Sequence, residues 1–360
     1  MSLSIVLAAV ISTNLPLPEG NYDVSVTFAT NSVVTVKSES RQLMLEKVTG
    51  GPHTFTVNIR TPSIAGERHV SLKPREIGVP HWDDKLELEF LGENPSLRSL
   101  KVTPTTKAIT VYLAGDSTVT EQPKEPWAGW GQMLPRFFKQ GVAIANHAES
   151  GLSLGTFKGS HRLEKVLSTM KPGDYLFIQF GHNDQKEKGE GVGPFASYKT
   201  NLIEFVTATR GKGGIPVLVT PMERRRFNED GKPYGTLSEY AEAVRQVGAD
   251  EKVPVIDLNA MSLKLYEALG QEKSKKAFVH YPAGTYPGQE KELKDDTHHN
   301  NYGGYELAKC MVEGIKANVP ELAKHLRNDT PAFDPNKPDS PESFDLPASP
   351  VVVGEKPDGS

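Results

Sequence analysis

Apolar and polar side chains alternate in short runs over the first hundred residues. The runs at 22–28, 32–37, 53–59 and 85–90 read YDVSVTF, SVVTVK, HTFTVNI and KLELEF. Period-two alternation is typical of strands that bury one face, and Gly, Pro and Asn separate these runs. The pattern predicts an all-β sandwich domain over residues 1–107. Residues 103–107 are expected to be a linker, because Pro104 removes a ladder donor.

A different pattern begins at residue 109. The segments at 109–115, 175–181 and 215–221 read ITVYLAG, YLFIQFG and IPVLVTP, and near-continuous apolar runs of this kind are typical of parallel strands covered on both faces. Between and after them, apolar residues recur at helical spacing. We therefore expect a three-layer α/β/α, flavodoxin-like domain with a parallel sheet over residues 108–328, with functional sites at the carboxyl ends of its strands.

The last segment, residues 329–360, is rich in Pro, Asp and Ser, and its proline density excludes a helix or a central strand. A disordered tail is one interpretation. The apolar residues Phe333, Phe344, Leu346 and 351–353 favour another, an extended strap that lies on the folded body.

Composition and charge narrow the function classes. The chain has 41 Lys and Arg against 45 Asp and Glu, a net charge of −4, so the basic footprint of a nucleic-acid binder is missing. The single cysteine, Cys310, excludes an internal disulfide and a cysteine-based zinc site. The apolar run Leu3–Ile11 is too short to span a bilayer, and either an export-signal remnant or a buried first strand fits it. We expect no membrane partner and an extracellular or periplasmic location.

The first candidate for chemistry is Ser117, in Gly115-Asp116-Ser117-Thr118 directly after the strand at 109–114. A serine on such a turn presents an exposed hydroxyl as a nucleophile at the top of the sheet, and its backbone N–H can face a carbonyl oxygen. The alternative is a turn serine that caps the next helix.

The second candidate is the segment Asp295-Asp296-Thr297-His298-His299, which precedes a predicted helix. Asp295 and His298 are three residues apart, so the carboxylate can accept from one imidazole nitrogen while the other faces a nucleophile. A solvated loop with Asn300 as a helix N-cap is an alternative. A metal site is disfavoured because adjacent histidines diverge and no ligand spacing accompanies them, so we expect neither metal nor cofactor.

Two further turns offer hydrogen-bond donors. Asn183, in Gly181-His182-Asn183-Asp184 after the strand at 175–180, can donate its amide to an oxyanion, and Gly151 can supply a backbone N–H. Their alternatives are an Asx turn and a simple turn glycine. Residues 151–155, GLSLG, match the GxSxG nucleophile elbow, but the residues before them make a poor buried strand.

These four blocks, in this order, closely resemble the SGNH or GDSL hydrolase superfamily. FGHND with D-x-T-H resembles its rhamnogalacturonan acetylesterase branch, and so does Trp-Ala-Gly-Trp-Gly at 127–131. The resemblance covers roughly residues 110–315, and bacterial members of the family carry an accessory β-sandwich. Leu152 is a departure, because the rhamnogalacturonan enzymes often have arginine there.

The resemblance implies a serine esterase that releases acetate from a rhamnogalacturonan or pectin-like polysaccharide or oligosaccharide, without a cofactor. It makes Ser117 the nucleophile and Asp295 and His298 the rest of a catalytic triad. It also makes the N–H groups of Ser117 and Gly151 and the Asn183 amide the oxyanion donors.

Substrate contacts are sought among aromatic and basic residues. Trp127 and Trp130 can stack on sugar rings or belong to the core, Trp82 is expected to be an exposed platform, and His182 is a further candidate contact. The basic residues Lys186, Lys188 and 224–226 suit an anionic polymer.

Two alternative functions remain open at this stage. A GDSL lipase or thioesterase acting on other esters would favour an apolar channel. An inactive carbohydrate-binding module is disfavoured because each expected catalytic position is filled. The sequence predicts no oligomeric state.

Overall fold

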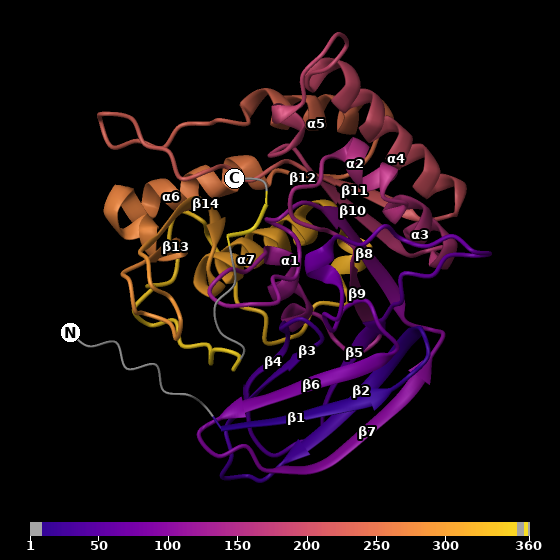
Figure 1. Ribbon diagram of the computed structural model, residues 1–360, viewed down its shortest axis with the longest axis vertical. Helices are drawn as coiled ribbons and strands as arrows, with labels where there is room; N and C mark the ends of the chain where they lie inside the picture. The colour runs from indigo at the N-terminus through magenta and orange to yellow at the C-terminus, as the bar shows by residue number, and fades with distance from the viewer. Residues whose placement is uncertain (1–8, 351–355, 359–360) are drawn as a thin grey trace.

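The protein is represented by a computed structural model that describes residues 9–350 and 356–358. Two antiparallel sheets lie at one end of the molecule and a parallel sheet with its helices at the other (Figure 1). Residues 351–353, expected to anchor a strap, fall outside the described residues. Among the described residues, no helix is long and apolar enough to cross a membrane.

The N-terminal sheets have the alternating burial that the sequence predicts at 20–28 and largely at 85–92, whereas all five residues at 34–38 are buried. One has the order β1 (Ala9–Pro16), β6 (Lys85–Gly92), β3 (Val34–Ser38), β4 (Gln42–Val48). The other has the order β5 (His53–Ile59), β2 (Gly20–Phe28), β7 (Leu97–Thr105). Their inner faces share one apolar core, in which the rings of Phe28 and Phe90 lie 5.7 Å apart.

The predicted linker at 103–107 is wrong for residues 103–105, which belong to a strand. Strand β7 continues to Thr105, and Pro104 lies opposite Tyr22 of β2. The reason is that β7 is an edge strand, where a residue without an N–H costs no ladder bond if it faces outward. Only residues 106–108 separate β7 from the next strand.

The second half of the chain forms the predicted three-layer α/β/α fold. Its sheet has five parallel strands in the order β12 (Val255–Ile256), β11 (Ile215–Val219), β10 (Tyr175–Gln179), β8 (Ile109–Gly115), β9 (Val142–Asn146). One face is covered by α1 (Trp130–Met133), α6 (Leu258–Lys273) and α7 (Asn301–Asn318). The other face is covered by α2 (Leu154–Gly159), α3 (Arg162–Thr169), α4 (Lys199–Gly211) and α5 (Ser238–Glu251).

The apolar runs are continuous because successive residues enter opposite cores. In β8, Val111 and Leu113 enter the core under α7, whereas Tyr112 and Ala114 enter the core under α4. A hairpin of β13 (Phe278–Tyr281) and β14 (Leu293–His299) precedes α7, and a short helix α8 (Pro320–Ala323) follows it.

Buried polar contacts join the two parts of the chain. Arg41, in the turn between β3 and β4, donates to the carbonyls of Gln122 (2.8 Å) and Trp127 (3.0 Å). It also donates to Asn301 Oδ1 at 2.9 Å and pairs with Glu125 at 2.6 Å. Arg41 has a backbone φ angle of 66° in this turn, which is uncommon for a residue other than glycine.

Residues 329–350 run over both parts of the molecule without regular structure. Phe344 packs against the rings of Tyr302 and Tyr305, at 5.6 and 5.5 Å. Further along, the Ser349 hydroxyl donates to Glu89 of β6 at 2.7 Å. This segment therefore connects α7 to the N-terminal sheets.

We expect Arg41→Ala to lower the free energy of unfolding by about 3–5 kcal/mol, because it leaves the buried Glu125 carboxylate without its close cation. Urea unfolding followed by circular dichroism measures the change. Arg98→Ala on the exposed side of β7 is the matched control and should stay within about 0.5 kcal/mol of the parent. Equal stability of the two variants would contradict the importance of this ion pair.

Candidate active site

Ser117 lies just beyond the end of β8, at the carboxyl edge of the parallel sheet. A side chain at Gly115 would come within 2.5 Å of Val119, so glycine permits the tight exit from the strand. Asp116 Oδ1 then accepts from the Thr118 N–H at 3.0 Å and from its hydroxyl at 2.8 Å. These bonds hold the turn that carries Ser117.

The structure brings Ser117, His298 and Asp295 together across 178 to 181 residues of sequence. His298 Nε2 is 2.8 Å from Ser117 Oγ, and His298 Nδ1 is 2.8 Å from Asp295 Oδ2. An ionised carboxylate only accepts hydrogen bonds, so the proton belongs on Nδ1 and Nε2 is left to accept from the serine hydroxyl. The arrangement is suited to general-base activation of the hydroxyl.

Asp295 is held in its charged form. Burial raises the pKa of its carboxyl, but the hydrogen bond and charge of His298 and the N–H groups of Thr297 and His298 outweigh burial. The net result is a pKa well below the usual range. The indole of Trp127 donates to the same carboxylate at 3.3 Å.

The residues around His298 explain how it is positioned. It lies near the end of β14, and Asn300 caps the following helix α7 by accepting from the Gly303 N–H at 3.0 Å. The neighbouring His299 points elsewhere, because its Nε2 lies 2.9 Å from the Tyr266 hydroxyl.

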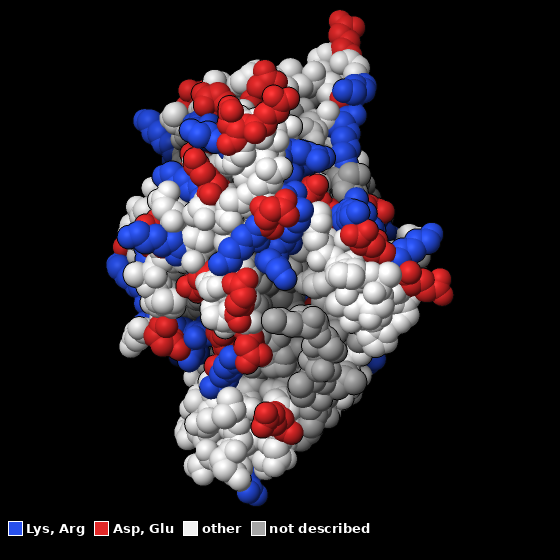
Figure 2. Space-filling view, turned by 90° about the vertical axis from the view of Figure 1, so that its left-hand side faces the viewer, with Lys and Arg blue, Asp and Glu red and all other residues white. Residues whose placement is uncertain are grey.

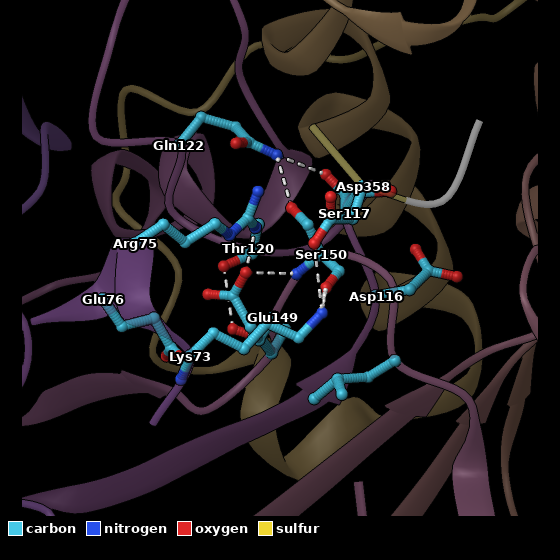
Figure 3. Close-up of polar contacts among 12 residues, drawn as sticks. Lys73, Arg75, Glu76, Asp116, Ser117, Thr120, Gln122, Glu149, Ser150 and Asp358 are labelled. Atoms are coloured by element: carbon cyan, nitrogen blue, oxygen red, sulfur yellow. Dashed lines mark hydrogen bonds and ion pairs between the residues drawn. The ribbon is translucent and has the colours of Figure 1, made fainter. Parts of the chain in front are cut away.

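The two loops with the predicted oxyanion donors lie side by side. Gly151 has φ +77°, and the Asn183 amide donates to the carbonyl of the adjacent Leu152 at 3.0 Å. That bond uses one of the two amide hydrogens. Gln122 joins the Gly151 loop to the nucleophile turn, since its amide lies 2.9 Å from the Ser117 carbonyl and 3.3 Å from Ser150 Oγ (Figure 3).

Ser153, the serine of the GxSxG match, has a structural role. It caps α2, accepting from the Thr156 N–H at 3.2 Å, and its hydroxyl donates to Glu187 at 2.6 Å. The buried strand β9 ends at Asn146, too early to form a nucleophile elbow.

The structure corrects the predicted aromatic contacts. Trp82, Trp127 and Trp130 are all buried. Trp130 donates to Gln179 Oε1 at 2.8 Å, and the guanidinium carbons of Arg60 and Arg162 lie 5.2 and 5.4 Å from the centre of the Trp82 ring. None of the three presents a free ring face, because their large apolar areas are used in the core and at the junction of the two parts.

The predicted polar contacts also need correction. His182 is fully buried, with Nδ1 3.3 Å from Asp116 Oδ2 beneath the nucleophile turn. Of the basic residues, Arg224 and Arg225 are buried, and Arg225 pairs with Asp296 at 2.8 Å. Lys186, Lys188 and Arg226 remain exposed.

Ser117 itself is only 1% exposed, whereas the sequence predicted an exposed hydroxyl. Two described residues near the end of the chain lie over this site. Lys356 Nζ is 4.0 Å from Asp295 Oδ2, and the Asp358 side chain lies against Gly151. The charged sequence Glu-Lys-Pro-Asp near the chain end is the sole local signal for this contact, and nothing in it specifies the location.

One cluster outside the predicted site could hold a metal by distance. Ligand atoms of Glu76, His81 and Glu149 lie within 4.8 Å of one another. However, Arg162 pairs with Glu76 at 2.5 Å and Arg75 pairs with Glu149. Burial and nearby arginines also hold the pKa of His81 well below its usual value. The carboxylates are already matched by cations, so the cluster fits an ion-pair network better than a metal.

A parallel sheet lies between two layers of helices, with Ser117, His298 and Asp295 at its carboxyl edge. This arrangement is typical of α/β ester hydrolases. The family model described as the GDSL-like Lipase/Acylhydrolase family matches residues 113–307, and the chain belongs to this family. The resemblance predicted from the four sequence blocks is therefore confirmed.

Similar proteins narrow the reaction to ester hydrolysis of the acetylesterase kind. Rhamnogalacturonan acetylesterase RhgT of Bacillus subtilis (strain 168) is 42% identical over 222 residues, which cover 61% of this chain and 95% of the relative. A probable rhamnogalacturonan acetylesterase, YesY, of the same organism is 36% identical over 209 residues, covering 57% and 92%.

A longer match reaches beyond the family region. The crystal structure of the Bacillus subtilis protein YxiM covers 85% of this chain and 80% of its own, with a TM-score of 0.52 and 25% identity. Residues from 113 to the end make up a smaller share of this chain than 85%. The matched region therefore includes part of the N-terminal sheets.

We expect Ser117→Ala to leave the fold intact and to abolish esterase activity, because the hydroxyl that faces His298 is lost. Hydrolysis of nitrophenyl acetate measures the effect, with Ser153→Ala as the matched control. An inactive Ser153 variant beside an active Ser117 variant would reverse the assignment of the nucleophile.

We expect Asp295→Asn to lower kcat roughly 10³-fold or more, since an amide no longer enforces the proton on His298 Nδ1. Asp296→Asn changes the neighbouring carboxylate, which pairs with Arg225, and should keep activity within a few-fold. Similar losses in both variants would indicate a general charge effect at β14.

Proposed function

We propose that the chain removes acetyl groups from an acetylated rhamnogalacturonan or pectin-like polysaccharide through an acyl-enzyme formed on a serine. The observation that carries the proposal is the hydrogen-bonded series Ser117, His298, Asp295, with both distances at 2.8 Å. The relatives named rhamnogalacturonan acetylesterases support the substrate class.

Acylation begins when His298 Nε2 takes the proton of Ser117 as Oγ attacks the acetyl carbonyl. Asp295 stabilises the resulting imidazolium because its carboxylate stays ionised. The oxyanion accepts from the Ser117 and Gly151 N–H groups and from the second hydrogen of the Asn183 amide. His298 then gives its proton to the sugar hydroxyl that leaves.

Deacylation repeats the same steps with water. His298 removes a proton from a water molecule as it attacks the acetyl-serine carbonyl, and the same donors hold the second oxyanion. Collapse of this intermediate releases acetate and returns the proton to Ser117 Oγ. In this mechanism each proton passes between His298 and either Ser117, water or the leaving sugar hydroxyl.

The surroundings of the site favour a small acyl group on a polar substrate over a lipid. A cavity of about 460 Å³ beside Trp127 is lined largely by polar and charged residues: Arg75, Glu76, His81, Gln122, Lys124, Glu149, Lys356 and Asp358. An alkyl chain would gain little by entering it, because burying charged groups against hydrocarbon is costly. This argues against the lipase or thioesterase alternative.

The surface charges are mixed, which favours recognition of the substrate by contacts at the site rather than by attraction to a large surface of one charge. Figure 2 shows acidic and basic side chains interspersed over the α/β part of one face, with few charges on the part that holds the antiparallel sheets. Export to the periplasm or the cell exterior belongs to the proposal, because plant polysaccharides lie outside the cell.

The test compares acetate release from acetylated pectin with hydrolysis of a nitrophenyl ester of a long-chain fatty acid. We expect the wild-type protein to release acetate and to leave the long-chain ester nearly untouched, with Ser117→Ala inactive on both. Faster turnover of the long-chain ester would overturn the proposal in favour of a lipase, and inactivity on both with a folded protein would favour a binding module.

A further inference from the structure

The carboxylate of Asp358 lies at the edge of the candidate catalytic site and pairs with Lys73 of the N-terminal part. Lys73 Nζ is 3.3 Å from Asp358 Oδ2. A Cβ at Gly151 would lie 2.9 Å from both Lys73 Nζ and the Asp358 Cβ. An anionic group and an ammonium therefore meet directly over the predicted oxyanion loop (Figure 3).

The ammonium of Lys73 is fixed in this position. It donates to the Ser150 carbonyl at 2.6 Å, and the Lys73 backbone N–H donates to Glu76 Oε2 at 2.8 Å. Lys73 thus begins the short 3-10 turn at 74–76, which places the N-terminal part beside the esterase loops. Its side chain is still 29% exposed, so one side remains open to a ligand.

The neighbouring arginines have firm carboxylate partners, whereas the carboxylate partner of Lys73 is exchangeable. Arg75 is occupied by Glu149, and Arg162 by Glu76. Among residues 9–350 and 356–358, Asp358 is the carboxylate that pairs with Lys73. Asp358 is 61% exposed, and an ion pair this exposed contributes little to stability, so another carboxylate can displace it.

We infer that Lys73 is a specificity-determining residue that binds the carboxylate of an acidic sugar in the acetylated chain, at the position that Asp358 takes in the absence of substrate. The inference rests on the proposed function for its substrate and deepens it. A uronate carboxylate has the charge and the two acceptor oxygens of the aspartate it would replace. A neutral acetylated sugar would gain nothing from Lys73.

The first experiment separates binding from chemistry. We expect Lys73→Gln to raise KM for acetylated uronic-acid oligosaccharides about tenfold, with kcat within about twofold, as for the loss of one charge-assisted hydrogen bond. KM for neutral acetylated xylooligosaccharides and for nitrophenyl acetate should stay within about twofold. Lys101→Gln, an exposed lysine on β7, is the matched control, and the melting temperature of each variant reports on folding.

The second experiment does not depend on the proposed reaction. Unacetylated uronic-acid oligosaccharide should inhibit nitrophenyl acetate hydrolysis by wild-type protein, more strongly in Asp358→Asn, and about tenfold less in Lys73→Gln. If acetylated pectin is not a substrate but this pattern holds, the proposed function fails while the carboxylate site stands. Equal inhibition of wild type and Lys73→Gln, or a loss in Lys73→Gln that is the same for acidic and neutral substrates, overturns the inference.

Discussion

One buried guanidinium, that of Arg41, holds the loop and the helix beside the candidate catalytic site. A charge removed from water is tolerated only when its partners are close and its hydrogen bonds are made. Arg41 meets this requirement with Glu125, two carbonyls of the loop after Ser117, and the first residue of α7. Burial raises the pKa of Glu125, but Arg41 and then Lys37 outweigh burial and keep the carboxylate ionised. The loop is thus shaped from outside the α/β fold.

The contacts of Arg41 also connect it to Asp295 and His298 through Trp127 and helix α7. Trp127, whose carbonyl accepts from Arg41, donates its indole N–H to Asp295, and Asn301 begins the helix that follows His298. Asp295 and His298 therefore lie beside elements tied to the turn between β3 and β4. Part of the fold outside the family-matched residues thus contacts the loop and the helix beside the Ser117–His298 pair.

Local pattern was enough to predict the strands with clear alternating or apolar runs and the order of the chemical blocks, because each depends on a short segment. It did not predict β9 or β14. Period-two alternation identified β2 and β5, and the apolar runs identified β8, β10 and β11. The burial of Ser117 and Trp82 was missed because it depends on residues far away in sequence, such as His298 for Ser117 and His147 and Arg162 for Trp82. Pro104 was misread because edge position is a property of the sheet, not of the residue.

Chemistry and selectivity have different origins in this fold. In the proposed reaction, proton transfer needs only Ser117, His298 and Asp295, which the α/β sheet and its last hairpin bring to one edge. The walls of the neighbouring cavity come instead from residues 73–81, 356–358, Glu149 and the loop at 122–127, of which only this loop is close to Ser117 in sequence. The exposed members of these segments, Lys124, Lys356 and Asp358, lie on a loop or near the chain end, where changes cost little stability, whereas Glu76, Glu125 and Trp127 are buried. Substrate preference can therefore change at the exposed positions while the core that positions Ser117, His298 and Asp295 stays constant.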